Sequence, residues 1–193
     1  MLILFAHGAG AGSQSPWMQS WVERLSTLGR VVTFDYPYMA RGRKSPDRLP
    51  KLIEAHRAML GEHRREGEAV LLAGKSMGSR VGCHLALEEE AAGLVCLGYP
   101  LVGGGKTRSV RDEVLMGLRT PIHFVQGTRD PLCPLATLDD VRGRMTTRTS
   151  LHIVDSGNHS LTTTKGWQKT TGLTQEDADQ AALASIAEFQ RSL

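Results

Sequence analysis

The sequence predicts a single three-layer α/β/α domain with a mostly parallel six-stranded sheet, and three observations carry the prediction. Short apolar runs alternate with amphipathic stretches along the whole chain, which is typical of strands joined by helical crossovers. Several of these runs are almost continuously apolar, as expected for strands that are covered on both faces. The length of 193 residues fits one domain, spanning residues 1–193.

The apolar runs and the helical periodicity define the elements in chain order. Strands are predicted at residues 2–6, 31–34, 69–73, 93–97, 122–125 and 150–154. Helices are predicted at residues 16–28, 49–65, 76–90, 135–143 and 175–191. Segments 36–46 and 100–110 are predicted to be irregular, and the Thr- and Gly-rich segment 160–174 is predicted to be a loop. Because ligands bind beyond the carboxyl ends of parallel strands, functional residues are expected directly after each strand.

Bulk composition is ordinary for a soluble globular protein, with 40% hydrophobic residues, 22% charged residues and a net charge of +3. Basic residues cluster locally at Arg41, Arg43, Lys44 and Arg48. We interpret this group as a solvated loop, and the alternative is that it favours an acidic substrate or partner. Nucleic acid is therefore not predicted as a partner. No apolar run approaches transmembrane length, and the first residues do not resemble a signal peptide. We therefore expect a cytoplasmic protein without a membrane partner.

The cysteine pattern points to a reducing compartment. Cys83, Cys96 and Cys133 are odd in number and lack C-x-x-C spacing, which argues against a disulfide framework and against a zinc site. Cys83 and Cys96 lie in a predicted helix and an apolar run, so we expect both to be small core residues. No metal is predicted.

The most informative motif is Gly74-Lys75-Ser76-Met77-Gly78, which fits G-x-S-x-G. Between a strand and a helix this pattern is a nucleophile elbow, a sharp turn that exposes the serine oxygen. Glycines flank the serine because larger side chains there would collide with the neighbouring strand and helix. Ser76 is therefore the predicted nucleophile.

The loop after the first strand, His7-Gly8-Ala9-Gly10, matches the Gly-rich loop that supplies one N–H of an oxyanion hole. We expect the two donors to be the backbone N–H groups of Ala9 and Met77. Each donor would stabilise the charge on a tetrahedral intermediate by about 3–4 kcal/mol. His7 precedes the serine, which is the wrong order for a general base in this arrangement, and we expect it to fix the loop.

Asp130 and His159 complete a predicted triad with Ser76. Each of the three directly follows a predicted strand, in the chain order Ser, Asp, His. His159 would be the general base and then the acid, and Asp130 would orient the imidazole and stabilise its charged form. Asp155 is a rival acid, ranked second because it is close in sequence to His159 and sits at the strand end.

Two nucleotide-binding patterns are incomplete. Gly74-Lys75-Ser76 ends like a phosphate-binding loop, but the glycine that this motif requires is replaced by alanine at position 69. Gly8-x-Gly10, followed by Asp35 after the second strand, begins like a dinucleotide-binding fold, but its third glycine is replaced by serine. No cofactor is therefore predicted.

Together these motifs resemble the α/β-hydrolase superfamily, and the resemblance covers nearly the whole chain. More closely, it resembles small cap-less serine hydrolases related to dienelactone-hydrolase-like proteins, and the group that contains a testis-expressed protein and the hydrolase-like domain of a histone-acetyltransferase complex subunit. The segments that carry it are residues 7–10, 34–39, 74–80, 97–101 and 125–131. It implies a minimal fold without a cap domain and a triad at Ser76, Asp130 and His159.

The chain departs from this family pattern in three places. Val102-Gly103-Gly104-Gly105 stands where relatives often carry prolines and a histidine, Asn158 stands where aspartate is common, and a Thr-rich stretch lengthens the segment after His159. These departures concern the pocket rather than the triad.

The expected activity is that of a cofactor-independent serine hydrolase, esterase- or thioesterase-like, that acts through an acyl-enzyme on a small ester, thioester or amide. The pocket is expected to be shallow and lined by Tyr36, Tyr99, Leu101 and Met77. Lys75 is expected to bind substrate by attracting a carboxylate or phosphate.

The alternative is a non-catalytic interaction or scaffold protein on the same fold. The presence of the whole triad and both Gly-rich turns favours the enzyme. Serine at position 76 argues against dienelactone hydrolysis, which usually uses cysteine, and excludes haloalkane and epoxide hydrolysis, which need aspartate there. The expected partner is a small acyl substrate, and the expected state is a monomer or homodimer.

Overall fold

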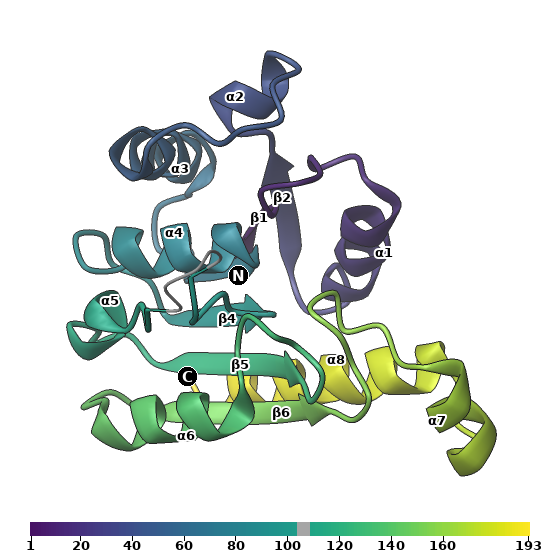
Figure 1. Ribbon diagram of the computed structural model, residues 1–193. Helices are drawn as coiled ribbons and strands as arrows, with labels where there is room; N and C mark the ends of the chain where they lie inside the picture. The colour runs from purple at the N-terminus through teal and green to yellow at the C-terminus, as the bar shows by residue number, and fades with distance from the viewer. Residues whose placement is uncertain (104–108) are drawn as a thin grey trace.

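The structure, a computed structural model, describes residues 1–103 and 109–193 and has a central six-stranded sheet with helices on both sides (Figure 1). The strands are β1 (Leu2–Ala6), β2 (Arg30–Phe34), β3 (Val70–Lys75), β4 (Gly93–Leu97), β5 (Ile122–Gly127) and β6 (Thr149–Val154). The helices are α1 (Pro16–Leu25), α2 (Pro37–Ala40), α3 (Leu49–His63), α4 (Met77–Leu85), α5 (Glu113–Met116), α6 (Leu135–Arg144), α7 (Lys165–Thr171) and α8 (Gln175–Arg191).

The strands lie in the order β2-β1-β3-β4-β5-β6, and every neighbouring pair is parallel. The predicted fold class is therefore confirmed. Val102 and Val110 form an isolated antiparallel bridge outside the sheet. Because all six strands run the same way, their carboxyl ends meet at one edge, where the loops that follow them come together.

Two apolar layers explain why the strands are so hydrophobic. Along β1, Leu2 and Leu4 belong to the core cluster under α3 and α4, whereas Ile3 and Phe5 belong to the cluster under α1 and α8. All five residues of β1 have no solvent-exposed surface. Side chains alternate between the faces of a strand, so a strand buried on both faces reads as one apolar run.

The predicted helix 76–90 ends earlier in the structure, where α4 stops at Leu85. Three successive glutamates at positions 88–90 follow, and negative charge is unfavourable at the carboxyl end of a helix. Two of them instead form ion pairs with Arg57 on α3.

The segment 160–174, predicted to be a loop, contains the helix α7. The Thr164 side chain accepts a hydrogen bond from the Trp167 N–H at its start, and Gly172, with φ 74°, ends it in the left-handed conformation. The predicted irregular segment 36–46 likewise contains one turn of helix, α2. Part of the other irregular segment, residues 104–108, lies outside the described residues.

The helix α8 begins with a capping box in which Thr174 and Asp177 bond to each other's backbone N–H. It has 17 residues and packs on the sheet through Ala182, Ile186 and Phe189. Among the residues that the structure describes, no helix combines the length and the apolar character needed to cross a membrane.

Candidate active site

Ser76, Asp130 and His159 lie together at the carboxyl edge of the sheet. Ser76 directly follows β3, Asp130 follows β5 and His159 follows β6. The Nε2 of His159 is 2.8 Å from the Oγ of Ser76, and its Nδ1 is 2.7 Å from the Oδ2 of Asp130. An imidazole protonated on Nδ1 donates to Asp130 and accepts from the serine hydroxyl. Asp155, the rival acid, is exposed, and Asp130 is the carboxylate that contacts the imidazole.

The backbone of Ser76 is strained, with φ 51° and ψ −112°. A non-glycine residue adopts this conformation only where its surroundings enforce it. The flanking glycines explain how: a Cβ added at Gly74 would lie 2.2 Å from the Ser79 nitrogen, and one at Gly78 would lie 2.4 Å from the Ala6 carbonyl oxygen. The G-x-S-x-G spacing thus allows β3 and α4 to approach closely enough to present Ser76 at the turn.

Asp130 is held as a hydrogen-bond acceptor on every side. Its Oδ2 accepts from Gln126 Nε2 at 2.5 Å as well as from His159, and its Oδ1 accepts from the Leu132 N–H at 2.8 Å. Burial is the largest single influence on the pKa of Asp130, and on its own it would raise this pKa. The hydrogen bond and positive charge of His159, together with the hydrogen bonds from Leu132 and Gln126, outweigh burial and lower the pKa below its usual value. Asp130 is therefore ionised at neutral pH.

His7 fixes the loop that carries Ala9. Its Nδ1 donates to the Gly8 carbonyl at 2.6 Å, and its Nε2 accepts the Tyr36 N–H at 3.0 Å. Burial lowers the pKa of His7, which keeps the ring in the neutral form that these two bonds require. Tyr38 adds a third tie, because its hydroxyl donates to the Ala9 carbonyl at 2.9 Å. The structure thus places His7 in the loop-fixing position expected from the sequence.

Ala9 and Met77, the expected oxyanion donors, both line a cavity that includes Ser76 in its wall. Met77 is the first residue of α4, so its N–H has no acceptor within the helix. Ala9 lines two cavities together with Ser76, and Met77 lines one of them.

Two cavities flank Ser76. The first has a volume of about 390 Å³ and includes Trp17, Met18, Lys75, Leu132 and His159 in its wall. The second has a volume of about 310 Å³ and is lined by Pro46, Asp47, Leu49, Leu52, Met77, Arg80, Val81, Pro100 and Arg111, besides Ala9 and Ser76. Ser76 stands at the border between the two, and His159 faces only the first.

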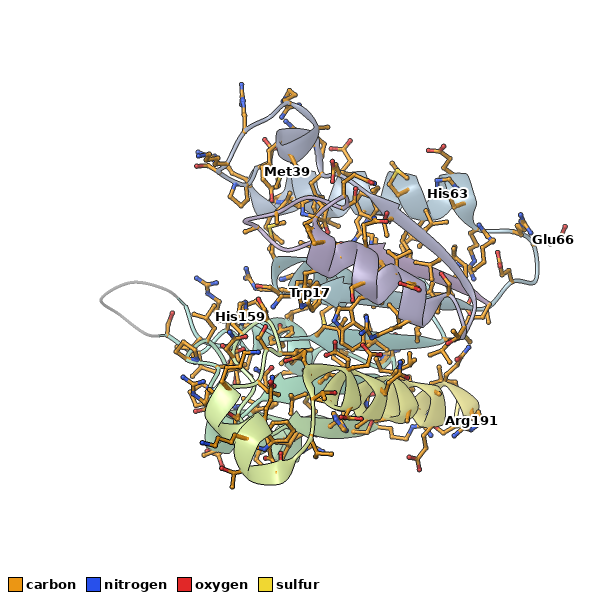
Figure 2. The ribbon with its side chains drawn as sticks, turned by 90° about the vertical axis from the view of Figure 1, so that its right-hand side faces the viewer. Trp17, Met39, His63, Glu66, His159 and Arg191 are labelled. Carbon is orange, nitrogen blue, oxygen red and sulfur yellow. The ribbon has the colours of Figure 1, made fainter. Side chains whose placement is uncertain are left out.

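Lys75 lines the first cavity, but its ammonium group already has a partner. It donates to the His159 carbonyl oxygen and lies 5.3 Å from the centre of the Trp17 ring. Trp17 in turn donates from Nε1 to the Ser160 carbonyl at 2.8 Å, and Figure 2 shows Trp17 beside His159. Burial lowers the pKa of Lys75 to about 8. The two side chains therefore hold consecutive carbonyls of the loop that carries the histidine.

Asn158, where the family pattern commonly has aspartate, shapes the same loop. Its Oδ1 accepts from the N–H groups of Ser160 at 2.8 Å and Thr162 at 3.1 Å. Leu161 within this turn has φ 62° and is buried. Asn158 thus stabilises the backbone turn that follows His159.

Three expected lining residues are corrected by the structure. Tyr36, Tyr99 and Leu101 are each 0% exposed and line neither cavity. Tyr36 instead contacts His56 through its hydroxyl at 3.2 Å, and Tyr99 packs edge-on against Phe124. Each follows a strand closely, and the sequence does not show whether such a side chain turns into the core or towards the site.

Four lining residues are not among those expected from the sequence: Trp17, Leu132, Arg80 and Arg111. Arg80 carried a signal, because it stands four residues after Ser76 on the same helix as the elbow. The other three come from α1 and from connecting segments, whose positions depend on tertiary packing. In residues 1–103 and 109–193, no three His, Cys, Asp or Glu side chains are arranged to hold a metal ion.

The family comparison covers almost the entire chain. Residues 1–191 match the model of a family described as an alpha/beta hydrolase domain.

Solved structures of low sequence identity share the fold. An alpha-beta serine hydrolase homologue from Coxiella burnetii aligns with a TM-score of 0.71 at 16% identity, covering 97% of this chain and 82% of that one. Dienelactone hydrolase from Anabaena variabilis aligns with a TM-score of 0.67 at 19% identity, covering 98% and 82%. A serine hydrolase without a lid from Xanthomonas campestris aligns with a TM-score of 0.66 at 17% identity, covering 83% and 73%.

Proposed function

Because the chain belongs to the alpha/beta hydrolase domain family, we propose that it is a serine hydrolase whose nucleophile is Ser76. Family membership supports a hydrolytic function and agrees with the resemblance drawn from the sequence. The observation that carries the finer proposal is the hydrogen-bonded chain from Ser76 through His159 to Asp130, with Ser76 on a strained turn.

The reaction that this geometry supports has two halves. The Ser76 oxygen attacks the acyl carbonyl while His159 Nε2 takes the hydroxyl proton, and the N–H groups of Ala9 and Met77 bind the developing oxyanion. His159 then gives the proton to the leaving oxygen or sulfur, which departs and leaves an acyl-enzyme. Water attacks the acyl-enzyme as His159 takes its proton, and His159 returns this proton to the Ser76 oxygen as the bond to the acyl carbon breaks and the acid is released. The ionised Asp130 stabilises the imidazolium form that occurs in both halves.

The two cavities support a proposed orientation of the substrate. The leaving group must lie next to His159, which protonates it, and His159 lines only the first cavity. The acyl part then extends from Ser76 into the second cavity. The proposed substrate class is a small ester, thioester or amide, all of which react by the same chemistry.

The test is hydrolysis of p-nitrophenyl pentanoate and of a matched thioester by the wild type and three variants. Ser76→Ala and His159→Gln should each lower kcat/KM by about 10³-fold or more, because the triad acts as a unit. Ser26→Ala, which changes an exposed serine after α1, should leave kcat/KM unchanged. Equal rates for the wild type and Ser76→Ala would contradict the proposal and favour a scaffold on this fold.

A further inference from the structure

The second cavity carries two arginines, one from the helix after the elbow and one from the segment before α5. Arg80 lies in the first turns of α4, and Arg111 precedes α5, with its guanidinium group against Gly103. Both line the cavity that also includes Ser76 in its wall. Two positively charged side chains therefore share one small cavity with the proposed nucleophile.

Neither arginine has an acidic partner among the described residues. The ion pairs of residues 1–103 and 109–193 include neither guanidinium group. Residues 104–108 contain no aspartate or glutamate that could pair with them. The Nε of Arg80 is buried without a hydrogen-bond partner, and a buried unpaired donor of this kind costs free energy unless a ligand satisfies it.

The other charged residue of this cavity, Asp47, is already neutralised by two cations. Its carboxylate lies 3.2 Å from Arg41 Nη2 and 3.2 Å from Lys51 Nζ. The cavity therefore has a surplus of positive charge that an anionic ligand would balance.

The position of His159 indicates that an anionic group bound in the second cavity would belong to the acyl part of the substrate. The leaving group occupies the first cavity because His159 must protonate it there, so the acyl chain enters the second cavity. At about 310 Å³, the second cavity is at the lower end of the range for small-molecule sites, which is about 300–1,000 Å³. A short acyl chain fits it better than a long one.

We propose that Arg80 and Arg111 bind a carboxylate at the far end of the acyl chain, so that the substrate is a monoester or monothioester of a short dicarboxylic acid. This inference rests on the proposed function. Hydrolysis breaks the bond between the acyl carbon and the leaving oxygen or sulfur, and water supplies the atoms that give a dicarboxylate and an alcohol or thiol. A guanidinium group suits this task because it offers a planar pair of N–H donors to a carboxylate.

The test compares two p-nitrophenyl esters with five-carbon acyl chains, the neutral pentanoate and the anionic hemiglutarate. The wild type should have a kcat/KM at least tenfold higher for the hemiglutarate. Arg80→Met and Arg111→Met should each lower the ratio of hemiglutarate to pentanoate kcat/KM at least tenfold. Lys44→Met, which removes an exposed cation from a neighbouring loop, should leave both rates unchanged.

A binding measurement keeps the two proposals separable. Calorimetry with Ser76→Ala should detect binding of methyl hydrogen glutarate, and adding Arg80→Met or Arg111→Met should weaken this binding at least tenfold. Because the two arginines lie on different segments, a folding defect in one variant does not remove the test. Ser76-dependent pentanoate hydrolysis without a preference for the hemiglutarate would overturn this inference and leave the proposed function standing. Absence of hydrolysis together with arginine-dependent binding would overturn the proposed function and, with it, the substrate assignment, and would leave only a carboxylate-binding site at Arg80 and Arg111.

Discussion

Replacing Lys75 by methionine should make the protein more stable and less active. Lys75 is only 8% exposed, and burial lowers the pKa of its ammonium group from 10.5 to about 8. A lowering of this size means that keeping the lysine charged costs the folded state about 3 kcal/mol at neutral pH. Methionine has a similar length without the charge and fills irregular space well. Since it also loses the contacts to Trp17 and His159, we expect the free energy of unfolding to rise by about 1–3 kcal/mol.

The stability difference between Lys75→Met and the wild type should depend on pH. Below pH 8 the lysine is protonated in both the folded and unfolded states, so the wild type carries the full cost. Between pH 8 and 10.5 the unfolded state binds more protons than the folded state, so the stability contribution of Lys75 rises with pH. The stability advantage of Lys75→Met should therefore be largest at pH 7 and should shrink through pH 8 to 10.

Urea denaturation followed by tryptophan fluorescence at pH 7, 8, 9 and 10 measures this difference, with Lys44→Met as the exposed control. In parallel, kcat/KM should fall about tenfold, because a hydrogen bond to a charged group contributes about 1.5 kcal/mol to holding the His159 loop. A variant that is less stable than the wild type by the same amount at every pH would refute the reasoning, since the ammonium group would then be a net stabiliser.

Three further predictions concern the triad, the elbow and a helix cap. Asp130→Asn should lower kcat by about 10⁴-fold because it disfavours the required imidazole tautomer, with the circular dichroism spectrum unchanged; a loss below tenfold would contradict the role of Asp130. Gly78→Ala should prevent stable folding, because the added Cβ would lie 2.4 Å from the Ala6 carbonyl oxygen. The control Gly61→Ala in α3, with nothing within 4 Å of the added Cβ, should stabilise the protein by up to about 1 kcal/mol in thermal melts. Equal melting temperatures of the two variants would refute the close approach at Gly78. Thr174→Ala should cost about 1 kcal/mol in urea denaturation through loss of the α8 cap, and an unchanged midpoint would argue against the cap.

Much of the fold and the three triad positions could be predicted from local sequence. The strands are apolar runs because both faces are buried, and the residues of the site directly follow them. Ser76 is recognisable because the elbow needs Gly74 and Gly78, whose added Cβ atoms would meet backbone within 2.4 Å. Asp130 and His159 were found by their chain order after successive strands, and the structure brings their side chains together.

The walls of the site could not be predicted in the same way. Tyr36 and Tyr99 turn into the core, because the direction of a side chain after a strand depends on the helices packed against it. Trp17, on α1, donates to the carbonyl of Ser160, the residue after His159. The two segments are far apart in sequence and close only in the folded state. Lys75 was expected to face a substrate, yet its partner is a backbone carbonyl 84 residues away. Such contacts arise from tertiary packing and leave no local pattern.

The activation of Ser76 is the central claim, and the intact mass of the protein after treatment with a fluorophosphonate probe tests it most directly. The wild type should gain one adduct within minutes, mapped to Ser76 by peptide analysis. Ser76→Ala should gain none, and His159→Gln should react far more slowly because the serine would lose its base. A well-folded wild type that stays unlabelled, or an adduct that persists in Ser76→Ala, would contradict the account.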